Sequence, residues 1–510
     1  MLITDNVLLN YKRCNRRTFL EVYGNSQQKD PEKDFLLKLK KENQLHILKV
    51  IQSRSLLITQ PQASIRNWQQ CARQTIALME RGVDCIGRGV LSLNFLQWQT
   101  VTNSEIVLSS GDREFDNPIF IASPTLLVKQ PGKSRFGDWQ YLPINIKLGR
   151  RPKPEYKLIA SFHAQMLGAI QGTIPNYSRL ILKSHNDYDV NLDYWLTNMQ
   201  NIVAECLQML AERYKPEVFI SRQRCSLCHW YSYCYDVAKR ERHLSLIPGI
   251  TPKRYEQLKE IGIANLATLA TTSATELNNI IGNGVGSQLK QQVDAILQRR
   301  AIVKSDYNLT AKNLIPTANI EFYFDIEAEP ERGIDYLLGI VLVDRINKTE
   351  KFYAFLAETP EDEAIIWQQF LNCVSLYPTA PIFHYSEYEV DTIVRLAKLY
   401  HTPHDLTQAL LSRLVDLHQR VLESVVLPVE SYSLKSLANW IGFYWRDEAA
   451  GGDLCVCWYD RWLATGDRLW LEAILDYNED DCRATFYLKN WLVEFLASEI
   501  VMSNSPSNQV

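Results

Sequence analysis

The sequence has no apolar run long enough to cross a bilayer. Its longest such stretch, YLLGIVLV at residues 336–343, is too short for a membrane span and is typical of a buried β-strand. The first residues, MLITDNVLLNYKRC, lack the basic start and the long apolar segment of a secretory signal. We therefore expect a soluble, cytoplasmic protein that does not act on membranes.

The chain also lacks an excess of charge of one sign. Its 55 Lys and Arg residues nearly balance its 58 Asp and Glu residues, which gives a formal net charge of -3. Any surface that binds nucleic acid must therefore be local. The chain contains no extended repeat array, and its 510 residues are enough for two to four domains.

Three regions of different character precede a short polar tail, which predicts a multi-domain α/β protein. Residues 1–240 mix strand and helix patterns. Residues 241–312 have short helical patterns with Gly turns and few aromatic residues. Residues 313–500 begin with strand patterns and end in a long helical pattern, which predicts an α/β domain. Residues 501–510 are expected to be disordered.

Four of the eleven cysteines form a candidate metal or cluster site. The segment RCSLCHWYSYC places Cys225, Cys228 and Cys234 in a C-x2-C-x5-C pattern, and Cys14 is the best candidate for a fourth ligand. Four thiolates in a cytosolic protein hold an iron–sulfur cluster or zinc. Zinc usually takes two close pairs, which favours the cluster, with zinc as the alternative. We expect the other cysteines to be reduced.

This constellation resembles the RecB/AddB-type nucleases with an iron–sulfur staple, which include the CRISPR-associated iron–sulfur exonucleases. The family's early motif is partly present, as Cys14, Arg16, Arg17 and Leu20. The resemblance covers residues 1–240. It implies a restriction-endonuclease-like fold of the PD-(D/E)XK type, in which a 4Fe-4S cluster ties the two ends of the domain together.

The same resemblance implies a Mg²⁺ site made of two acids and a lysine, but this chain departs from that pattern. Thr125 and Asn145 stand where the acids belong, whereas Lys147 is present. Neutral side chains cannot replace two anions around a divalent cation without a large loss of affinity. We interpret the domain as catalytically degenerate and able to bind nucleic acid. The alternative is an active domain that uses a nearby acid, namely Asp112, Glu114, Asp116 or Asp138.

The middle region resembles a pair of helix-hairpin-helix elements. The stretch SLIPGITPKRYEQLKEIGIANLATLA is the first, and IIGNGVGSQLKQQVDAIL is the second. In such elements Gly249, Gly284 and Gly286 would bring backbone N–H groups close to a phosphate. Residues 241–312 are therefore predicted to bind nucleic acid without regard to sequence.

The stretch FYFDIEAEP places two acids in a strand that is otherwise apolar. Asp325 and Glu327 are two residues apart, so they point to the same face. Two adjacent carboxylates stay ionised together only where a cation joins them. Further along, DYNEDDCRAT places Tyr477 and Asp481 one helical turn apart, and HYSEYE places Glu389 after another apolar strand.

These motifs resemble the DEDD exonucleases of the ribonuclease H-like fold, in the tyrosine-containing variant, and look most like the YprB-like branch. The whole chain resembles RecB-like nucleases that carry this domain at the C-terminus. The resemblance implies two Mg²⁺ or Mn²⁺ ions, roughly 4 Å apart, held by four acids: Asp325, Glu327, Glu389 and Asp481. It also implies that Tyr477 orients the attacking water. Glu389 departs from the family, which has Asp there, and we expect Asp416 to be a supporting acid.

The sequence thus predicts a hydrolase, namely a metal-dependent 3′ to 5′ exonuclease that acts on DNA or RNA through its C-terminal domain. One alternative is a nucleic-acid-binding protein without catalysis. Another is a nuclease whose N-terminal domain is still active.

Overall fold

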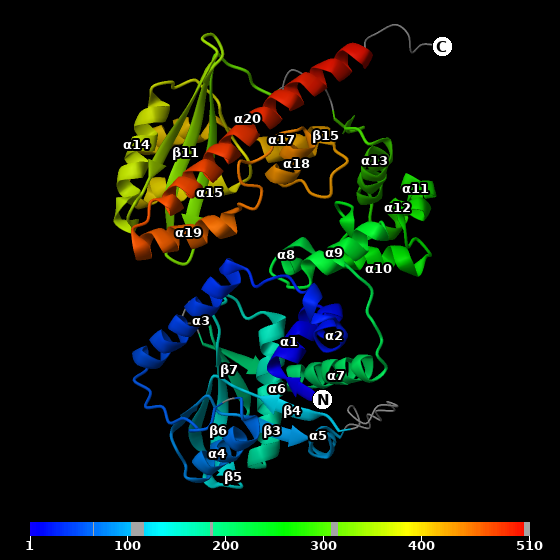
Figure 1. Cartoon of the computed structure of the whole chain (residues 1–510), viewed down its shortest axis with the longest axis vertical. Coiled ribbons are helices and arrows are strands. Elements are labelled where there is room, and N and C mark those ends of the chain that lie inside the picture. Colours follow the sequence, from blue (N-terminus) through cyan, green and yellow to red (C-terminus); the bar gives the residue numbers. More distant parts are fainter. Residues whose placement is uncertain (65, 104–116, 184–186, 308–314, 504–510) are drawn as a thin grey trace. The chain divides into compact units, whose positions relative to one another are not determined.

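The computed structural model describes residues 1–64, 66–103, 117–183, 187–307 and 315–503 (Figure 1). The chain divides into two compact units. Unit 1 comprises Met1–Val218 and Arg222–Val237, and unit 2 comprises Phe219–Ser221 and Ala238–Val510. Within the described stretches, no helix has both the length and the apolar character that a membrane span needs.

Unit 1 is a mixed α/β structure built on two sheets. The larger sheet has the strand order β2-β5-β6-β7-β8, and the smaller has the order β1-β4-β3. In the larger sheet β6 and β7 are parallel neighbours, and α6 connects them, as a parallel pair requires a crossover. The strands are β1 (Leu2–Thr4), β2 (Cys85–Gly87), β3 (Leu91–Asn94), β4 (Ile119–Ala122), β5 (Leu126–Ser134), β6 (Gly137–Ile146), β7 (Tyr177–Ile181) and β8 (Asp187–Asn191).

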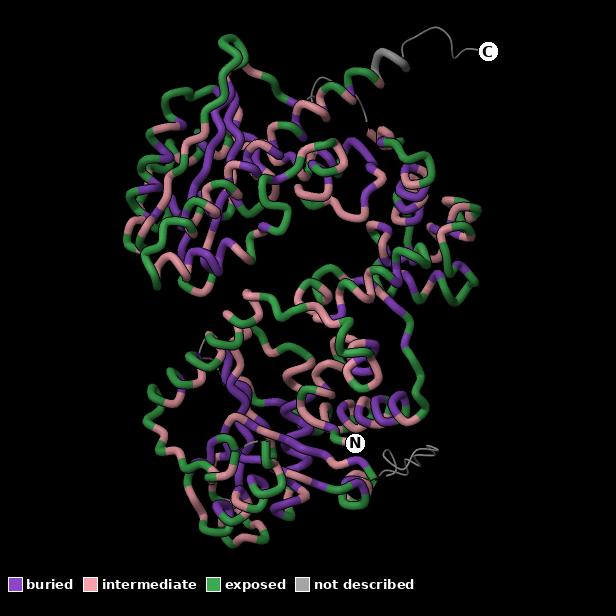
Figure 2. The backbone as a smooth tube through the Cα atoms, viewed as in Figure 1, coloured by how far each residue is buried: buried purple, intermediate pink, exposed green. Residues whose placement is uncertain are grey.

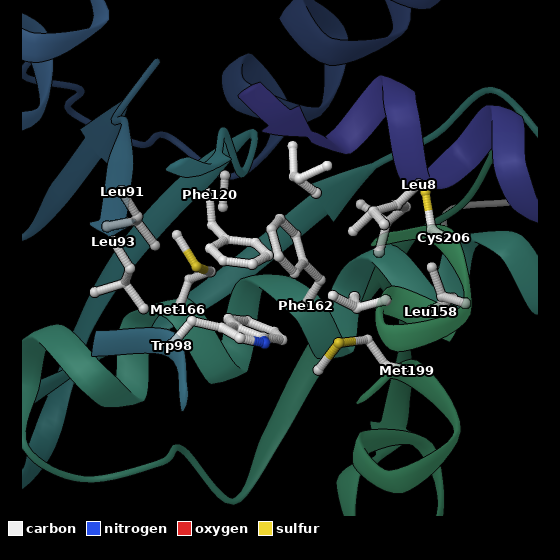
Figure 3. Packing of buried hydrophobic residues seen from close by; sticks show 14 of the residues in the cluster. Leu8, Leu91, Leu93, Trp98, Phe120, Leu158, Phe162, Met166, Met199 and Cys206 are labelled. Carbon is white, nitrogen blue, oxygen red and sulfur yellow. The ribbon is translucent and has the colours of Figure 1, made fainter. Parts of the chain in front are cut away.

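The core of unit 1 forms around α6, which is buried on nearly all sides. Phe162 of α6 packs beside Trp98 and Phe120, whose rings stack with centroids 4.5 Å apart (Figure 3). The α-helices are α1 (Asp5–Arg13), α2 (Asn15–Tyr23), α3 (Asp34–Ser53), α4 (Trp68–Glu80), α5 (Phe95–Thr102), α6 (Pro154–Gln171), α7 (Leu192–Ala211), α8 (Arg222–Cys225) and α9 (Tyr231–Arg240).

Unit 2 contains a five-stranded sheet with the order β12-β11-β10-β13-β14. The pairs β12–β11 and β11–β10 are antiparallel, whereas β10–β13 and β13–β14 are parallel. The five strands are β10 (Ile320–Glu329), β11 (Ile334–Asp344), β12 (Thr349–Leu356), β13 (Ile382–His384) and β14 (Leu414–Asp416). Figure 2 shows that the central strands are buried along most of their length.

Helices cover both faces of this sheet. Phe324 of β10 packs on Phe370 of α14, and Tyr323, its neighbour on the opposite face, packs on Phe486 of α20. This alternation confirms that β10 has one face for α14 and the other for α20. The helices are α14 (Glu363–Ser375), α15 (Tyr388–Leu399), α16 (His404–Leu411), α17 (Leu417–Ser424), α18 (Leu434–Trp440), α19 (Gly452–Thr465) and α20 (Leu469–Ser503).

A buried ionic network fixes α20 to the start of β10. Lys489 of α20 and Glu321 of β10 are both almost fully buried, and the Lys489 Nζ donates to Glu321 Oε1 at 2.7 Å. Arg345 and the Tyr323 hydroxyl donate to the other carboxylate oxygen of Glu321. Each buried charge therefore has hydrogen-bond partners, as burial of an ion requires.

Four short helices form the first part of unit 2. These are α10 (Pro252–Glu260), α11 (Leu266–Thr271), α12 (Ala274–Ile281) and α13 (Val285–Gln298). They connect to the sheet domain through β9 (Ile302–Val303), which pairs with β15 (Val425–Val426). In addition, Gln292 of α13 donates to the Leu427 carbonyl at 2.7 Å.

The C-terminal helix is longer than the sequence pattern predicts. α20 continues to Ser503, so the first three residues of the segment 501–510, predicted to be a disordered tail, are helical. The remainder of that segment lies outside the described residues.

Candidate active site

Two carboxylates of the candidate site come from β10. Asp325 lies opposite Gly339 of β11, and Glu327 lies opposite Leu337. The register shifts directly after Glu327, where a β-bulge interrupts the pairing. Bulges of this kind often re-aim a side chain next to an active site. The two acids point to the α20 face, as the alternation of the sequence predicts.

The third carboxylate comes from α20. Oxygens of Asp325, Glu327 and Asp481 all lie within 4.8 Å of one another. In the part of the chain that the structure describes, this is the one group of three or more acidic, His or Cys ligands at such spacing. The structure therefore brings together three of the four acids predicted to hold metal.

A glycine allows α20 to approach the sheet closely enough for Asp481 to reach Asp325 and Glu327. A Cβ atom on Gly339 would lie 1.7 Å from Asn478 Oδ1, far inside contact distance. Asn478 itself is buried, and its Nδ2 donates to Asp325 Oδ2 at 2.8 Å. Gly339 and Asn478 thus set the distance between α20 and β10, and Asn478 also orients the Asp325 carboxylate.

Burial and mutual repulsion make the three acids hard to ionise together. Burial raises the pKa of Asp325 well above its usual value, and the charges of Asp481 and Glu327 raise it further. Burial and the Asp481 charge raise the pKa of Glu327 in the same way. Burial raises the pKa of Asp481 to about 7. Such a group keeps its negative charges at neutral pH only beside a cation.

Two donors lie near the Asp481 carboxylate. Trp445 Nε1 donates to Asp481 Oδ1 at 2.7 Å, and the nearby Tyr477 hydroxyl, like Trp445, lowers the pKa of this carboxyl against the effect of burial. Burial raises the pKa of Tyr477, with the charges of Asp481, Glu327 and Asp325 adding to the shift. The hydroxyl therefore stays protonated and can donate. Sequence reasoning identified Tyr477 but missed Trp445, because nothing in the local pattern of residues 441–451 points to the metal centre.

Glu389 lies outside the group of three. It is buried in the first turn of α15, directly after β13, and its Oε2 accepts from Ser386 Oγ at 3.2 Å. The same oxygen is 3.5 Å from Nδ1 of the buried His384. The Glu389 charge still raises the pKa of Asp325, so the two carboxylates are within electrostatic range.

Asp416 is the N-cap residue of α17. Its Oδ1 accepts from the backbone N–H groups of His418 and Gln419, and it thereby caps the start of α17. This contact agrees with the supporting role that the sequence suggested.

The predicted N-terminal site lies in unit 1, where β4, β5 and β6 meet. Thr125 Oγ1 accepts from the Ile146 N–H at 3.2 Å, next to Asn145 on β6. The Asn145 side chain is buried and its Nδ2 has no hydrogen-bond partner. Burial lowers the pKa of Lys147, whereas the charge of Asp5 raises it. The three predicted residues are therefore near one another.

Sequence reasoning missed the acid in this region, which is Asp5. Its Oδ2 accepts from the Ser123 N–H at 3.0 Å, and its Oδ1 is 3.0 Å from Nε2 of the buried His163. In the sequence, Asp5 follows the helix cap Thr4 and looks like an ordinary first-turn acid of α1. Only the fold brings it near Lys147.

Of the four alternative acids, the structure describes Asp138 alone. Asp138 is at the other end of β6, roughly 23 Å from Asn145 at about 3.3 Å per residue. Asp112, Glu114 and Asp116 lie outside the described residues.

The cysteines from the two ends of unit 1 lie near one another. The charge of Cys14 raises the pKa of both Cys228 and Cys234, on top of the larger effect of burial. Cys225 ends α8, and its carbonyl accepts from the Cys228 N–H at 3.0 Å. Arg16 lowers the pKa of Cys234 against the larger effect of burial, so a cation lies near a potential thiolate ligand.

The glycines of the middle region differ in role. Gly249 and Gly284 have positive φ values of 88° and 78°, and each has open space where a side chain would lie. In Gly286, by contrast, a Cβ would lie 2.2 Å from the Asn278 backbone nitrogen. Gly286 therefore permits α13 to pack on α12.

Comparison with protein families identifies the fold of the sheet domain. The family model of the RNase_H superfamily matches residues 322–493. This range contains all three clustered carboxylates, Tyr477 and Glu389. No curated protein matches the chain. The chain therefore carries a C-terminal RNase H-like domain, a type of domain that acts on nucleic acid and usually uses divalent metal ions.

Proposed function

We propose that the C-terminal domain is a metal-dependent nuclease, and specifically a 3′ to 5′ exonuclease on DNA or RNA. The observation that carries the proposal is the group of three carboxylates, Asp325, Glu327 and Asp481, within 4.8 Å of one another. Their raised pKa values mean that the group favours a bound cation over three free negative charges. The RNase H-like fold around them supports phosphodiester hydrolysis rather than another metal-dependent reaction.

The donor set fits Mg²⁺ or Mn²⁺, since both ions prefer carboxylate oxygens. Bound divalent ions supply Lewis acidity, which lowers the pKa of water and offsets charge on the scissile phosphate. In our proposal Asp325, Glu327 and Asp481 hold two such ions, and Glu389 completes the set. Asn478 and Trp445 orient the carboxylates of Asp325 and Asp481. The protonated Tyr477 hydroxyl orients the attacking water.

The test is a digestion assay on the full-length protein with Mg²⁺, Mn²⁺ or EDTA. Substrates are single- and double-stranded DNA and RNA of equal sequence, labelled in turn at either end. A 3′ to 5′ exonuclease releases the 3′ label first as a mononucleotide and shortens 5′-labelled strands in a ladder. Absence of metal-dependent cleavage on every substrate would instead favour a protein that binds nucleic acid without cutting.

For unit 1 we propose a RecB-like domain that no longer cuts and carries a 4Fe-4S cluster on Cys14, Cys225, Cys228 and Cys234. The donor set is one of thiolates with Arg16 nearby. Such a set of thiolates suits an iron–sulfur cluster, with zinc as the alternative.

For residues 241–312 we propose phosphate binding by helix-hairpin-helix elements. A hollow of about 550 Å³ lies between the start of α10 and the end of α12. Lys253 and Arg254 line it, close to the hairpin glycine Gly249, whose carbonyl accepts from Arg254 Nη1. Cations at a helix start with a nearby glycine turn are suited to backbone phosphates of either strand.

A second candidate function is nuclease activity in unit 1, and the observation that favours it is the position of Asp5. This acid lies beside His163 and within electrostatic range of Lys147, so unit 1 has one carboxylate where Thr125 and Asn145 supply none. A single carboxylate with a histidine is a poorer metal site than the three acids of unit 2. We therefore assign the principal activity to unit 2.

A further inference from the structure

A second hollow of unit 2 lies along the C-terminal half of α20, away from the three carboxylates. Its volume is about 490 Å³, within the range of sites that bind small molecules. Its walls come from the end of α13, from β9, from α18 and from α20, which Figure 1 draws in red. The charged and aromatic side chains that line it are Arg299, Arg300, Trp440, Trp491, Phe495 and Glu499.

The apolar part of this pocket consists of aromatic rings rather than aliphatic side chains. Trp440 of α18 meets Trp491 of α20 edge to face, with ring centroids 5.5 Å apart. Trp491 also stacks on Phe495, at 5.2 Å and an interplanar angle of 10°. All three side chains are only partly buried, so part of each ring surface is open to solvent. Such rings form a platform on which a flat group can stack.

The polar part of the pocket is mainly cationic. Arg299 and Arg300 are exposed, and Arg300 Nε donates to Gln298 Oε1, which leaves its other N–H groups for a ligand. Arg299 closes α13 in a left-handed conformation, with φ of 52°. Glu499 contributes a carboxylate, which repels phosphate and can accept hydrogen bonds from base N–H groups. Two guanidinium groups beside stacked rings match a nucleotide, with its phosphate and its flat base.

A series of aromatic rings runs from the metal centre to Tyr487, one helical turn before the pocket residue Trp491. Trp445, which donates to Asp481, meets Phe443 at 5.3 Å, and Phe443 meets Tyr487 at 5.1 Å. Tyr487 is 51% exposed and lies one helical turn before Trp491 on α20. From Asp481 to Trp491 the helix rises about 15 Å. A stacked strand advances about 3.4 Å per nucleotide, so about four nucleotides cover this distance.

We propose that this pocket is a binding subsite for single-stranded nucleic acid whose end lies at the three carboxylates. Bases stack on Trp491 and its neighbouring rings, and the phosphates lie on Arg299 and Arg300. The ligand is single-stranded because the faces of its bases must be free to stack, whereas in a duplex they are covered. This inference rests on the proposed function, since it adds a substrate class and a path to the same site.

Binding is measured by fluorescence anisotropy of full-length protein in EDTA, so that neither metal nor cleavage contributes. The probes are labelled strands of three and twelve nucleotides, as oligo-dT and oligo-U, and a twelve-base-pair duplex. The test variant is Arg299→Ala with Arg300→Ala. Its matched control is Lys348→Ala with Arg468→Ala, which removes two exposed charges elsewhere on unit 2. Trp491→Leu is compared with Trp491→Phe, which keeps a flat ring.

The double arginine variant should bind the twelve-nucleotide strand about tenfold more weakly than the control, with a salt slope about 1.4 units smaller, since each phosphate contact to a single strand contributes about 0.7. The three-nucleotide strand covers fewer of the stacking and arginine contacts and should bind every variant more weakly than the twelve-nucleotide strand does. Trp491→Leu should lose about tenfold in affinity, and Trp491→Phe should restore most of it. The duplex should bind more weakly than the single strand.

Equal binding of the twelve-nucleotide strand by the arginine variant and its control would overturn the proposal. Preference for the duplex would overturn it as well. The proposed function is tested separately by Mn²⁺-dependent digestion. Binding through Arg299, Arg300 and Trp491 without any digestion leaves the subsite standing and removes the exonuclease. If the protein digests nucleic acid but the arginine variant and its control bind and digest the strand equally well, the exonuclease stands and the subsite is removed.

Discussion

At the scale of single residues, the metal centre depends on the absence of one side chain. Gly339 leaves the space into which Asn478 inserts, and Asn478 in turn holds Asp325. Neither residue is a predicted metal ligand, yet together they decide how closely α20 approaches β10.

We predict that Gly339→Ala destabilises the protein by about 1–3 kcal/mol, because the new methyl group overpacks against Asn478. Metal binding should weaken in parallel, since Asp481 moves with α20. Urea unfolding and Mn²⁺ titration measure the two effects. Adding Asn478→Ala should recover part of the lost stability, because it removes the clash, although it also removes a donor to Asp325. A Gly339→Ala protein as stable as wild type would contradict this account of the close approach.

A second residue-scale prediction concerns Glu321. Glu321→Gln should destabilise the protein by about 3–5 kcal/mol at neutral pH, because it leaves Lys489 buried without a counter-charge. The exposed acid Glu472 on α20 provides the control, since Glu472→Gln changes the net charge equally. Equal urea midpoints for the two variants would show that the network contributes no stability.

The same carboxylate gives a pH dependence with a defined sign. Burial alone raises the pKa of Glu321, but the hydrogen bonds from Arg345, Lys489 and Tyr323 outweigh it and lower the pKa below the usual 4.5. The stabilisation is therefore complete above about pH 4.5 and is lost as the pH falls through the lower folded-state value. The difference in unfolding free energy between wild type and Glu321→Gln should shrink in that acidic window.

Some of these residues could be predicted from the sequence and some could not. Strand alternation placed Asp325 and Glu327 on one face of a strand, and helical spacing placed Tyr477 and Asp481 on one face of a helix. Both parts of the site could therefore be predicted from short stretches of sequence. Trp445 and Asn478 act through contacts between distant segments, which no local pattern encodes. Glu389 follows β13 as expected, but its hydrogen bond to Ser386 could not be predicted.

At the scale of elements, helices α8 and α9 carry part of the proposed cysteine site. They carry Cys225 and Cys234, while Cys14 lies between α1 and α2 at the other end of unit 1. The sequence spacing showed the pattern of three cysteines. That Cys14 comes near them is a property of the fold, which the family resemblance anticipated and composition did not.

We predict that anaerobically purified protein contains iron and sulfide and absorbs in the visible range, and that Cys228→Ser loses both. The thermal unfolding temperature should fall as well, because the staple between α8 and the start of α2 is lost. Cys373→Ser in unit 2 is the control and should keep the cluster. Stoichiometric zinc without iron would refute the cluster and retain a metal staple, whereas metal-free, stably folded wild-type protein would refute both.

The other element-scale prediction concerns the end of β6. Lys147→Ala should leave metal-dependent digestion within about twofold of wild type, because Thr125 and Asn145 provide no metal site for Lys147 to assist. The decisive comparison is made in Asp325→Ala protein, in which the proposed site of unit 2 is disabled. Should that protein still degrade nucleic acid, and should either Lys147→Ala or Asp5→Asn then stop it, unit 1 is a working nuclease and our interpretation of Thr125 and Asn145 is wrong.

At the scale of the whole molecule, the chain combines two α/β units: unit 1 contains the four cysteines, and unit 2 contains the three clustered carboxylates. The short helices α10–α13 belong to the same compact unit as the RNase H-like domain, through the β9–β15 pair and the contact of Gln292 with Leu427. The change in composition near residue 241 separated these helices from unit 1. Their attachment to the sheet domain could not be predicted, since it rests on contacts between residues more than a hundred positions apart.

The sheet order of unit 2 was likewise only partly visible. The strand patterns at residues 320–343, the short apolar strand before Glu389 and the C-terminal helix were visible in the sequence, whereas β14 has only three residues and β9 and β15 only two each. Strands this short give no periodic signal. The resemblance of the acidic motifs to a known family, rather than the strand pattern, therefore anticipated the RNase H-like domain.

The most direct test of the central claim is the rate at which Mn²⁺-loaded protein releases the 3′-terminal nucleotide from a labelled single strand. Wild type is compared with Asp325→Asn and Asp481→Asn, which keep the size of the side chain and remove its charge. We predict that each substitution lowers this rate by at least a hundredfold while the thermal unfolding temperature falls by no more than a few degrees. Wild-type rates in both variants, in protein free of contaminating nuclease, would contradict the assignment of catalysis to these three carboxylates.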